Sequence, residues 1–201
     1  MKSPRKIVLN PNRDNIKFAV LKLREDEKDP KICFRWLLDI IREQGANTTK
    51  HLIYCRTIKD AQRVWNTLHR ELDSDAYWPK GAARTTKNRL IEMFHSTTLQ
   101  YIKDYVLSTI QEKSSHLRII IATNALGMEL NFIGVSNLEF YEALSTMDTM
   151  MQQMGRIGIC RSQSFITVQY HSHQLQGVDV VVKALVKSQK CLILVPPRNP
   201  P

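Results

Sequence analysis

The sequence contains few of the features that mark secreted, metal-binding or membrane-spanning chains. Its 201 residues include four cysteines and seven glycines, and no two cysteines form a CxxC pair. A zinc site or a disulfide framework within the chain is therefore unsupported, and a reducing compartment is expected. No apolar run approaches the roughly 18 residues that a membrane span needs, and the basic first residues include no apolar stretch suited to a secretory signal. We therefore expect no membrane partner.

Several catalytic motifs are also absent. No glycine is followed by lysine, so the phosphate-binding loop of P-loop NTPases is missing. The sequence has neither a serine-nucleophile elbow nor an HExxH zinc motif. Residues 26–29 (DEKD) resemble an acidic magnesium-binding tetrad, but without a P-loop before them a charged loop preceding a helix is the favoured interpretation. The sequence alone therefore predicts no complete NTP-hydrolysing site.

Positive charge is in clear excess. The chain has 29 Lys and Arg against 19 Asp and Glu, which gives a net charge of +10. Such a surplus favours a polyanionic partner, because neutralised phosphates release their counterions; a basic but unspecialised surface is the plainer alternative. The length predicts one domain, with or without a small appendage, that buries about 70% of its unfolded surface.

Apolar patterns predict strands that alternate with helices along the chain. Predicted strands cover residues 16–23, 51–55, 118–123, 136–141 and 164–170, and residues 89–94 fit either a strand or a helix. Predicted helices cover residues 30–44, 57–72, 99–110, 145–153 and 178–186. This order predicts an α/β fold in which a mostly parallel sheet is covered by helices on both faces. Ligands in such sheets gather at the carboxyl ends of the strands.

Capping residues and helical spacing predict where individual helices begin and which faces they bury. Asp29 and Pro30 form a cap and first turn, Thr57 forms a capping box with Asp60, and Ser145 caps a short helix with Asp148. In the first helix, one buried face is predicted from the apolar positions, namely Ile32, Cys33, Trp36, Leu37, Ile40 and Ile41.

Two separated segments give the strongest functional signal. In the first, RIIIAT runs into NALGMELN, where Gly127 permits a tight backbone and Asn131 can direct an amide toward a ligand. In the second, Gln152 precedes residues 155–158 (GRIG), whose glycines let the backbone approach closely while the guanidinium of Arg156 suits phosphate oxygens. GRxG alone is typical of a surface turn, but its combination with the first segment at this spacing is more specific.

In combination, these segments resemble the second RecA-like lobe of RecQ-type superfamily-two DNA helicases. The stretches LIYCRTIKDA, MFHSTT, RIIIATNALGMELNFIGV and MMQQMGRIG are similar to the family's motifs in order, and the resemblance covers nearly the whole chain. It implies an N-terminal extension at residues 1–12, a three-layer RecA-like lobe at residues 13–175 and the start of a zinc module at residues 176–201. Cys191 would be the first zinc ligand; because the remaining ligands are missing, zinc is not expected in this chain.

The resemblance also implies roles for residues at a nucleotide cleft. Gln152 and Arg156 would face the phosphates of ATP across the cleft between two lobes, and Gly127 and Asn131 would line the same cleft. Arg161 is a second candidate catalytic residue, because it lies two positions beyond the place where the family has its final arginine.

Departures from the family pattern weaken this nucleotide site. Ile159 occupies the position of that final arginine, and an arginine finger is worth about 10³–10⁵ in rate. Glu129 introduces a carboxylate beside the expected phosphate cleft.

Three further residues would contact the DNA backbone. They are Arg56 and His95, which directly follow a predicted or candidate strand, and Thr123, which is the last residue of a predicted strand. Each also has a plainer interpretation: a solvated loop cation for Arg56, a turn histidine for His95 and a strand-ending residue for Thr123.

The resemblance therefore implies the C-terminal lobe of an ATP-dependent 3′-to-5′ DNA helicase of DNA repair and recombination. ATP with Mg would act only when the chain pairs with a P-loop-bearing first lobe, so the chain alone is expected to bind DNA weakly and to hydrolyse nothing. A nuclear location is expected in a eukaryote and a cytoplasmic one otherwise. The alternatives are a non-catalytic nucleic-acid-binding module and a DEAD-box-like RNA helicase lobe; NALGMELN and LVKSQKC weigh against the latter.

Overall fold

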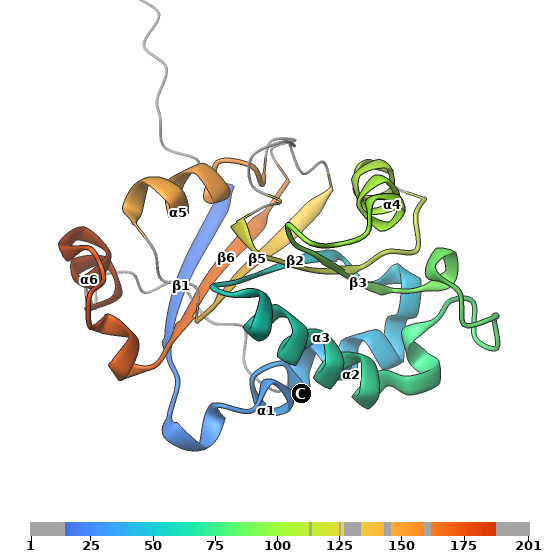
Figure 1. The fold of residues 1–201 in the computed structure, drawn as a ribbon, viewed down its shortest axis with the longest axis horizontal. Helices are drawn as coiled ribbons and strands as arrows, with labels where there is room; N and C mark the ends of the chain where they lie inside the picture. The colour runs from blue at the N-terminus through green and yellow to red at the C-terminus, as the bar shows by residue number, and fades with distance from the viewer. Residues whose placement is uncertain are drawn as a thin grey trace, which may run out of the picture.

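One parallel sheet organises the molecule. The computed structural model describes residues 15–112, 114–124, 126, 134–142, 146–158 and 162–187. Within them, six strands pair in parallel in the order β1-β6-β5-β2-β4-β3 (Figure 1). The strands are β1 (Ile16–Lys22), β2 (Lys50–Cys55), β3 (Ile91–Phe94), β4 (Ile119–Ala122), β5 (Val135–Tyr141) and β6 (Ser164–Tyr170). The predicted α/β class is confirmed.

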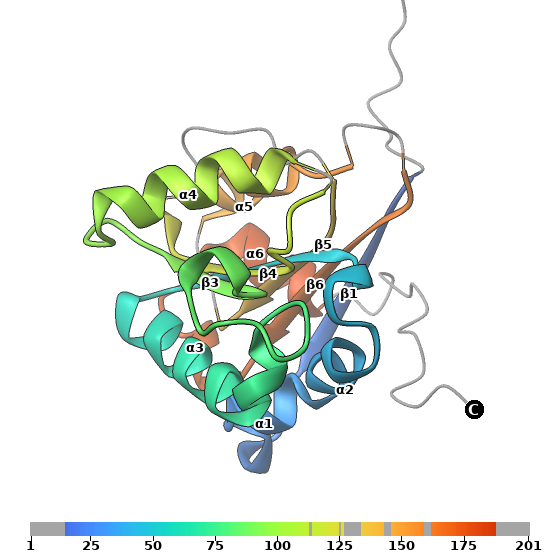
Figure 2. The same cartoon turned by 90° about the vertical axis from the view of Figure 1, so that its right-hand side faces the viewer.

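Helices cover both faces of the sheet and complete three layers (Figures 1 and 2). One face carries α4 (Gln100–Gln111), α5 (Met147–Met154) and α6 (Val180–Lys187). The other face carries α1 (Pro30–Cys33), α2 (Arg35–Gln44) and α3 (Ile58–Leu72). In this described part of the chain, no helix has the length and apolar character needed to cross a membrane.

Alternate residues of strand β2 pack into two separate cores. Leu52 and Tyr54 belong to the core beneath α4, α5 and α6. Ile53 and Cys55 belong to the core beneath α1, α2 and α3. Because helices cover both faces, a central parallel strand is apolar along its whole length rather than alternating. This is why β2 and β4 could be predicted from short continuous apolar runs.

The first predicted helix is interrupted at Phe34. Its start is as predicted, with Pro30 in the first turn and the Asp29 carboxylate accepting the N–H of Lys31 at 2.9 Å. Phe34 has φ −108° and ψ 17°, so α1 ends there and α2 begins with a changed rotation. The prediction that Ile32 is buried is therefore wrong: it is 51% exposed, and Phe34 is fully buried instead.

Three other local predictions can be compared with the structure. Within the ambiguous stretch 89–94, residues Ile91–Phe94 form strand β3. Thr57 caps α3 as predicted, because its hydroxyl accepts the N–H of Asp60 at 3.1 Å. The predicted cap of α5 at Ser145 is wrong. Thr146 fills this position and accepts the N–H of Thr149 at 3.3 Å, whereas Ser145 lies outside the described residues.

Candidate nucleic-acid and nucleotide interface

The parallel sheet places the three predicted DNA-contacting residues along one edge. Arg56, His95 and Thr123 follow the last residues of β2, β3 and β4, and β4 pairs with both of the other strands. The N–H of Thr123 donates to the carbonyl oxygen of Phe94 at 3.2 Å. The carboxyl edge of the sheet therefore brings together residues that lie far apart in the sequence, although their contact with DNA stays a prediction.

His95 belongs to a tight polar turn between β3 and α4. Its backbone N–H donates to the Thr98 hydroxyl at 2.9 Å, and the Thr97 hydroxyl lies 3.0 Å from its Nδ1. The residue is only 6% exposed. Burial lowers the pKa of His95 below its usual range, and the nearby Lys103 ammonium lowers it further. At neutral pH the imidazole therefore offers hydrogen bonding rather than positive charge to a phosphate.

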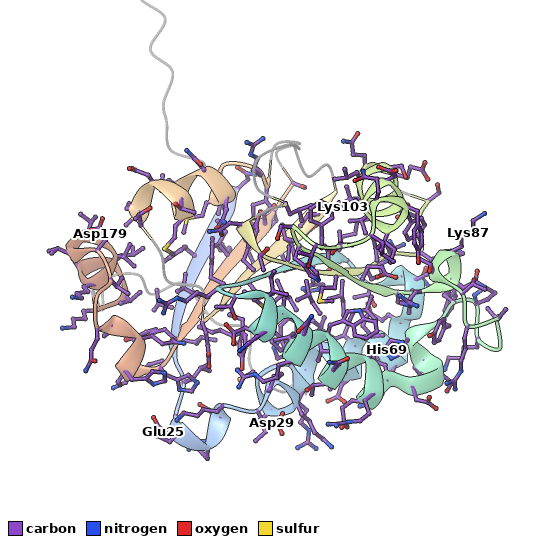
Figure 3. All side chains as sticks on the ribbon, in the orientation of Figure 1. Glu25, Asp29, His69, Lys87, Lys103 and Asp179 are labelled. Carbon is purple, nitrogen blue, oxygen red and sulfur yellow. The ribbon has the colours of Figure 1, made fainter. Side chains whose placement is uncertain are left out.

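Cations near this edge are more accessible. Arg56 is exposed and directly precedes Thr57, the N-cap of α3. Lys103 lies on α4 (Figure 3), and its ammonium donates to the carbonyl oxygen of Ser96 at 2.7 Å. An exposed guanidinium beside the positive end of a helix dipole suits an approaching anion. Arg56 is thus the described residue at this edge best suited to a phosphate contact.

A buried glutamine connects the two segments that the sequence singled out. The Gln153 side chain on α5 donates to the Asn124 side-chain oxygen at 2.7 Å, and Asn124 follows Thr123. Gln153 is 4% exposed, whereas its neighbour Gln152, the predicted nucleotide contact, faces solvent. Sequence reasoning missed Gln153, yet its helical spacing from the buried Met150 marks it as an inward-facing position.

Arg156 lies just beyond the end of α5. Its backbone N–H donates to the carbonyl oxygen of Gln153 at 3.2 Å, and the residue is half-buried. Burial raises the pKa of the Tyr54 hydroxyl, and the positive charge of Arg156 partly opposes that rise. Arg156 therefore lies on the α5 side of the sheet, within electrostatic range of the carboxyl end of β2.

The second glycine of GRIG is required by its own chain rather than by a ligand. Gly158 has φ +64°, and a Cβ there would lie 2.9 Å from the Asn15 side-chain nitrogen. That nitrogen donates to the carbonyl oxygens of Gly158 and Ser162, each at 2.9 Å. A side chain at this position would meet both unfavourable backbone geometry and a steric clash.

The remaining predicted site residues lie outside the described part of the chain. They are Gly127, Asn131 and Arg161, together with Glu129, Ile159 and Cys191. Their roles stay predictions. Within the described residues, no group of three His, Cys, Asp or Glu side chains could hold a metal ion.

Comparison with known families identifies the domain. The helicase conserved C-terminal domain family matches residues 33–160, well over half of the chain and including every strand from β2 to β5. The chain belongs to this family. Comparison of this helicase C-terminal domain with curated protein sequences gives no significant match.

Solved helicase structures share the fold at low sequence identity. The Mycobacterium smegmatis helicase Lhr bound to ssDNA and AMP-PNP aligns with a TM-score of 0.63 at 16% identity, covering 92% of this chain and 23% of that one. A DEAD box protein from Methanococcus jannaschii aligns with a TM-score of 0.58 at 17% identity, covering 81% of this chain and 38% of that one. S. cerevisiae Dbp5 bound to RNA and ADP BeF3 aligns with a TM-score of 0.56 at 16% identity, covering 85% of this chain and 40% of that one. The helicase C-terminal domain thus has a RecA-like fold and spans less than half of each of these chains.

Proposed function

We propose that this domain is the second RecA-like lobe of a RecQ-like, ATP-dependent DNA helicase and acts with a P-loop-bearing first lobe. The proposal rests on the hydrogen bond between Gln153 and Asn124. It joins the helix that precedes Arg156 to the turn that follows Thr123. One packed unit therefore carries a candidate nucleotide contact and a candidate DNA contact, as coupling between ATP and DNA requires.

Each residue has a physical task in this proposal. The planar guanidinium of Arg156 would donate to phosphate oxygens of ATP with Mg bound to the first lobe. Gly127, Asn131 and Gln152 would line the same cleft. At the carboxyl edge, Arg56 would contact backbone phosphates, which fix the position of a strand without reading its sequence. Closure and reopening of the two lobes would then move the strand.

An RNA helicase lobe is the second candidate. It is favoured by the fold shared with a DEAD box protein and with Dbp5, whose structure contains RNA. The sequences NALGMELN at residues 124–131 and LVKSQKC, which ends at Cys191, favour the RecQ-like alternative. The third candidate is a non-catalytic nucleic-acid-binding module. It is motivated by Ile159 and Glu129, which depart from the family pattern.

Competition between nucleic acids distinguishes the first two candidates. A fluorescent single-stranded DNA is bound to the chain, and unlabelled DNA and RNA of the same sequence are added at fixed ionic strength. We expect DNA to displace the probe at the lower concentration. Stronger displacement by RNA would contradict the DNA assignment and support an RNA helicase lobe.

ATP hydrolysis tests the two-lobe part of the proposal. The chain alone should show no DNA-stimulated ATPase, whereas mixing it with an isolated RecQ-type first lobe should produce activity. Arg156→Lys should reduce that activity by about 100-fold or more, because a point charge cannot replace a bidentate fork. Arg70→Lys, on the exposed surface of α3, is the matched control and should have no effect. If the mixture shows no ATPase activity even when the chain carries Ile159→Arg, the non-catalytic module is supported instead.

A further inference from the structure

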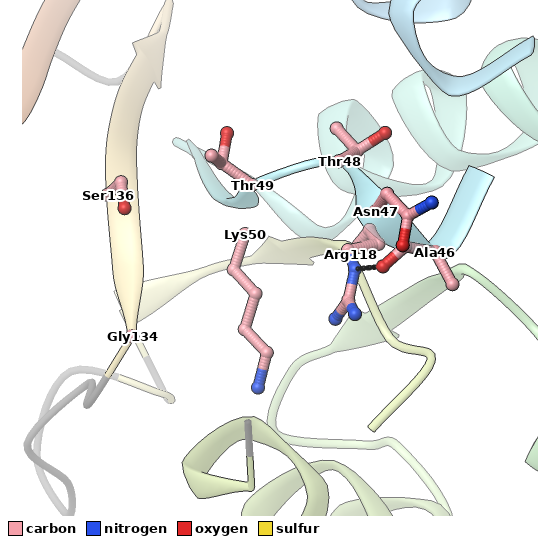
Figure 4. Close-up of a pocket in the computed structure, with 8 residues that line it drawn as sticks. All are labelled: Ala46, Asn47, Thr48, Thr49, Lys50, Arg118, Gly134 and Ser136. Atoms are coloured by element: carbon pink, nitrogen blue, oxygen red, sulfur yellow. Dashed lines mark hydrogen bonds between the residues drawn. The ribbon is translucent and has the colours of Figure 1, made fainter. Parts of the chain in front are cut away.

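A cavity of about 330 Å³ opens at the amino edge of the sheet, opposite the edge that carries Arg56, His95 and Thr123. It lies where β2, β4 and β5 begin (Figure 4). Its lining consists of Ala46, Asn47, Thr48, Thr49, Lys50, Arg118, Gly134 and Ser136. Among the described residues, this lining includes two cations and several polar groups but no carboxylate.

The two cations are buried and close to each other. Lys50 is 7% exposed and Arg118 is 8% exposed. They lie at the starts of the paired strands β2 and β4, where the N–H of His51 donates to the carbonyl oxygen of Arg118 at 2.7 Å. The charged ends of Lys50 and Arg118 extend to the same side (Figure 4). Two like charges removed from water in one cavity raise the free energy of the fold unless an anion compensates them.

Hydrogen bonds within the fold use only part of the available donors. The Lys50 ammonium donates to carbonyl oxygens of α4 and the residue that follows it, with distances of 3.3 Å to Thr109, 2.9 Å to Ile110 and 2.6 Å to Glu112. These contacts use its three N–H groups, so Lys50 contributes charge to the cavity rather than free donors.

Arg118 retains a donor in the cavity, whereas the Thr48 hydroxyl is buried beside it. Arg118 donates through Nε to the carbonyl oxygen of Ala46 at 2.6 Å and through Nη1 to that of Leu117 at 2.9 Å. A guanidinium has five N–H groups, and within the described residues no acceptor contacts Nη2. Thr48 is 4% exposed, and its hydroxyl has no partner in the same part of the chain. The cavity therefore combines positive charge with a guanidinium N–H group that makes no hydrogen bond to the described residues, and an oxyanion needs both.

The pKa of Lys50 reflects its burial beside a second cation. Burial lowers its pKa to about 8, and the neighbouring Arg118 guanidinium adds to this lowering. The Glu112 carboxylate opposes it but has a smaller effect. Burial also lowers the pKa of Arg118. A bound anion would favour the charged form of both groups.

We propose that this cavity binds a phosphate group, either as inorganic phosphate or as the phosphate of a small monoester. The oxyanion would accept from Nη2 of Arg118, while Lys50 supplies charge. The polar groups of Asn47 and Ser136 would surround it. The proposal goes beyond the helicase function, because this cavity lies at the opposite edge of the sheet.

A charge introduced at the rim tests the site without removing either cation. Asn47→Asp is isosteric, and Asn47 is exposed in the cavity lining. Binding of inorganic phosphate to the full chain is measured by calorimetry at constant ionic strength. We expect saturable binding that Asn47→Asp weakens about tenfold by repulsion. Asn66→Asp makes the same charge change on exposed α3, away from the cavity, and should leave the affinity unchanged. Absence of saturable binding, or equal effects of the two variants, would overturn the proposal.

A second measurement locates the bound ion and separates its sources. The pKa of Lys50, followed by NMR of its ε-carbon, should rise above about 8 in saturating inorganic phosphate. Glycerol phosphate should raise it at a lower concentration if the site takes a monoester and at a higher one if it takes the free ion. A pKa that phosphate leaves unchanged, or that only a short single-stranded DNA raises, would contradict a small-phosphate site.

Discussion

The two edges of the sheet carry positive charge in opposite ways. At the carboxyl edge, Arg56 is exposed to solvent and lies beside the start of α3. At the amino edge, Lys50 and Arg118 are more than nine-tenths buried and donate to backbone carbonyls. An exposed cation loses little hydration on folding and stays available to a passing polyanion. A buried cation loses its hydration when the chain folds, so it must be compensated by the protein or by a bound ion.

Substitutions at the two edges of the sheet should therefore affect different properties of the protein. Changes at the amino edge should act on the free energy of unfolding. Changes at the carboxyl edge should act on affinity for nucleic acid and leave that free energy almost unchanged. Three measurements sharpen this contrast.

The largest effect is expected from Lys50→Met. This change leaves the carbonyl oxygens of Thr109, Ile110 and Glu112 without the ammonium, and we expect the free energy of unfolding in urea to fall by about 2–3 kcal/mol. Lys59→Met, at an exposed position of α3, is the matched control and should change it by no more than about 0.5 kcal/mol. Equal stabilities of the two variants would show that Lys50 is not a structural cation.

A smaller effect is expected in the pH dependence of stability. The pKa of Lys50 is about 8 in the folded state, below its usual value of 10.5. Between these values the unfolded chain binds more protons, so the contribution of this group to stability rises with pH. From pH 7 to pH 9, the native chain should gain about 1 kcal/mol relative to Lys50→Met. Urea unfolding of both proteins at each pH gives this difference, and a decrease would contradict the assigned charge state.

The smallest effect on stability is expected from Arg56→Met. The free energy of unfolding should stay within about 0.5 kcal/mol of the native value, because the side chain is exposed. Binding of single-stranded DNA should weaken several-fold, and the salt dependence should lose about 0.7 in slope, as expected for one phosphate contact. Arg70→Met, exposed near the end of α3, should change neither. If both arginines gave the same result, the effect would reflect net charge alone.

Much of the fold could be predicted because its local signals agree with its tertiary packing. Strands β2 and β4 are short apolar runs, and both are covered by helices on two faces. Asp29 and Thr57 are capping residues that accept backbone N–H groups as their positions predict. These elements depend on neighbours that lie a few residues away in the sequence.

Other features depend on contacts that a local pattern does not contain. The apolar spacing continues through Phe34, so the break between α1 and α2 could not be read from it. Lys50 contacts carbonyls about sixty residues away, and its proximity to Arg118 follows from the strand order rather than from the sequence around either residue. Gln153 could have been found from helical spacing, but its partner Asn124 could not.

Strand β1 pairs only with β6 in the described sheet, and Asn15 fastens its start to Gly158, which lies 143 positions later. During synthesis, the segment therefore leaves the ribosome well before its neighbour exists. At translation rates of about 5–20 residues per second, this delay is on the order of ten seconds. For that interval the segment Ile16–Lys22, whose central apolar residues are flanked by Lys17 and Lys22, has no native strand to pair with. A chaperone that recognises such segments could therefore bind β1 early in synthesis and for a long interval.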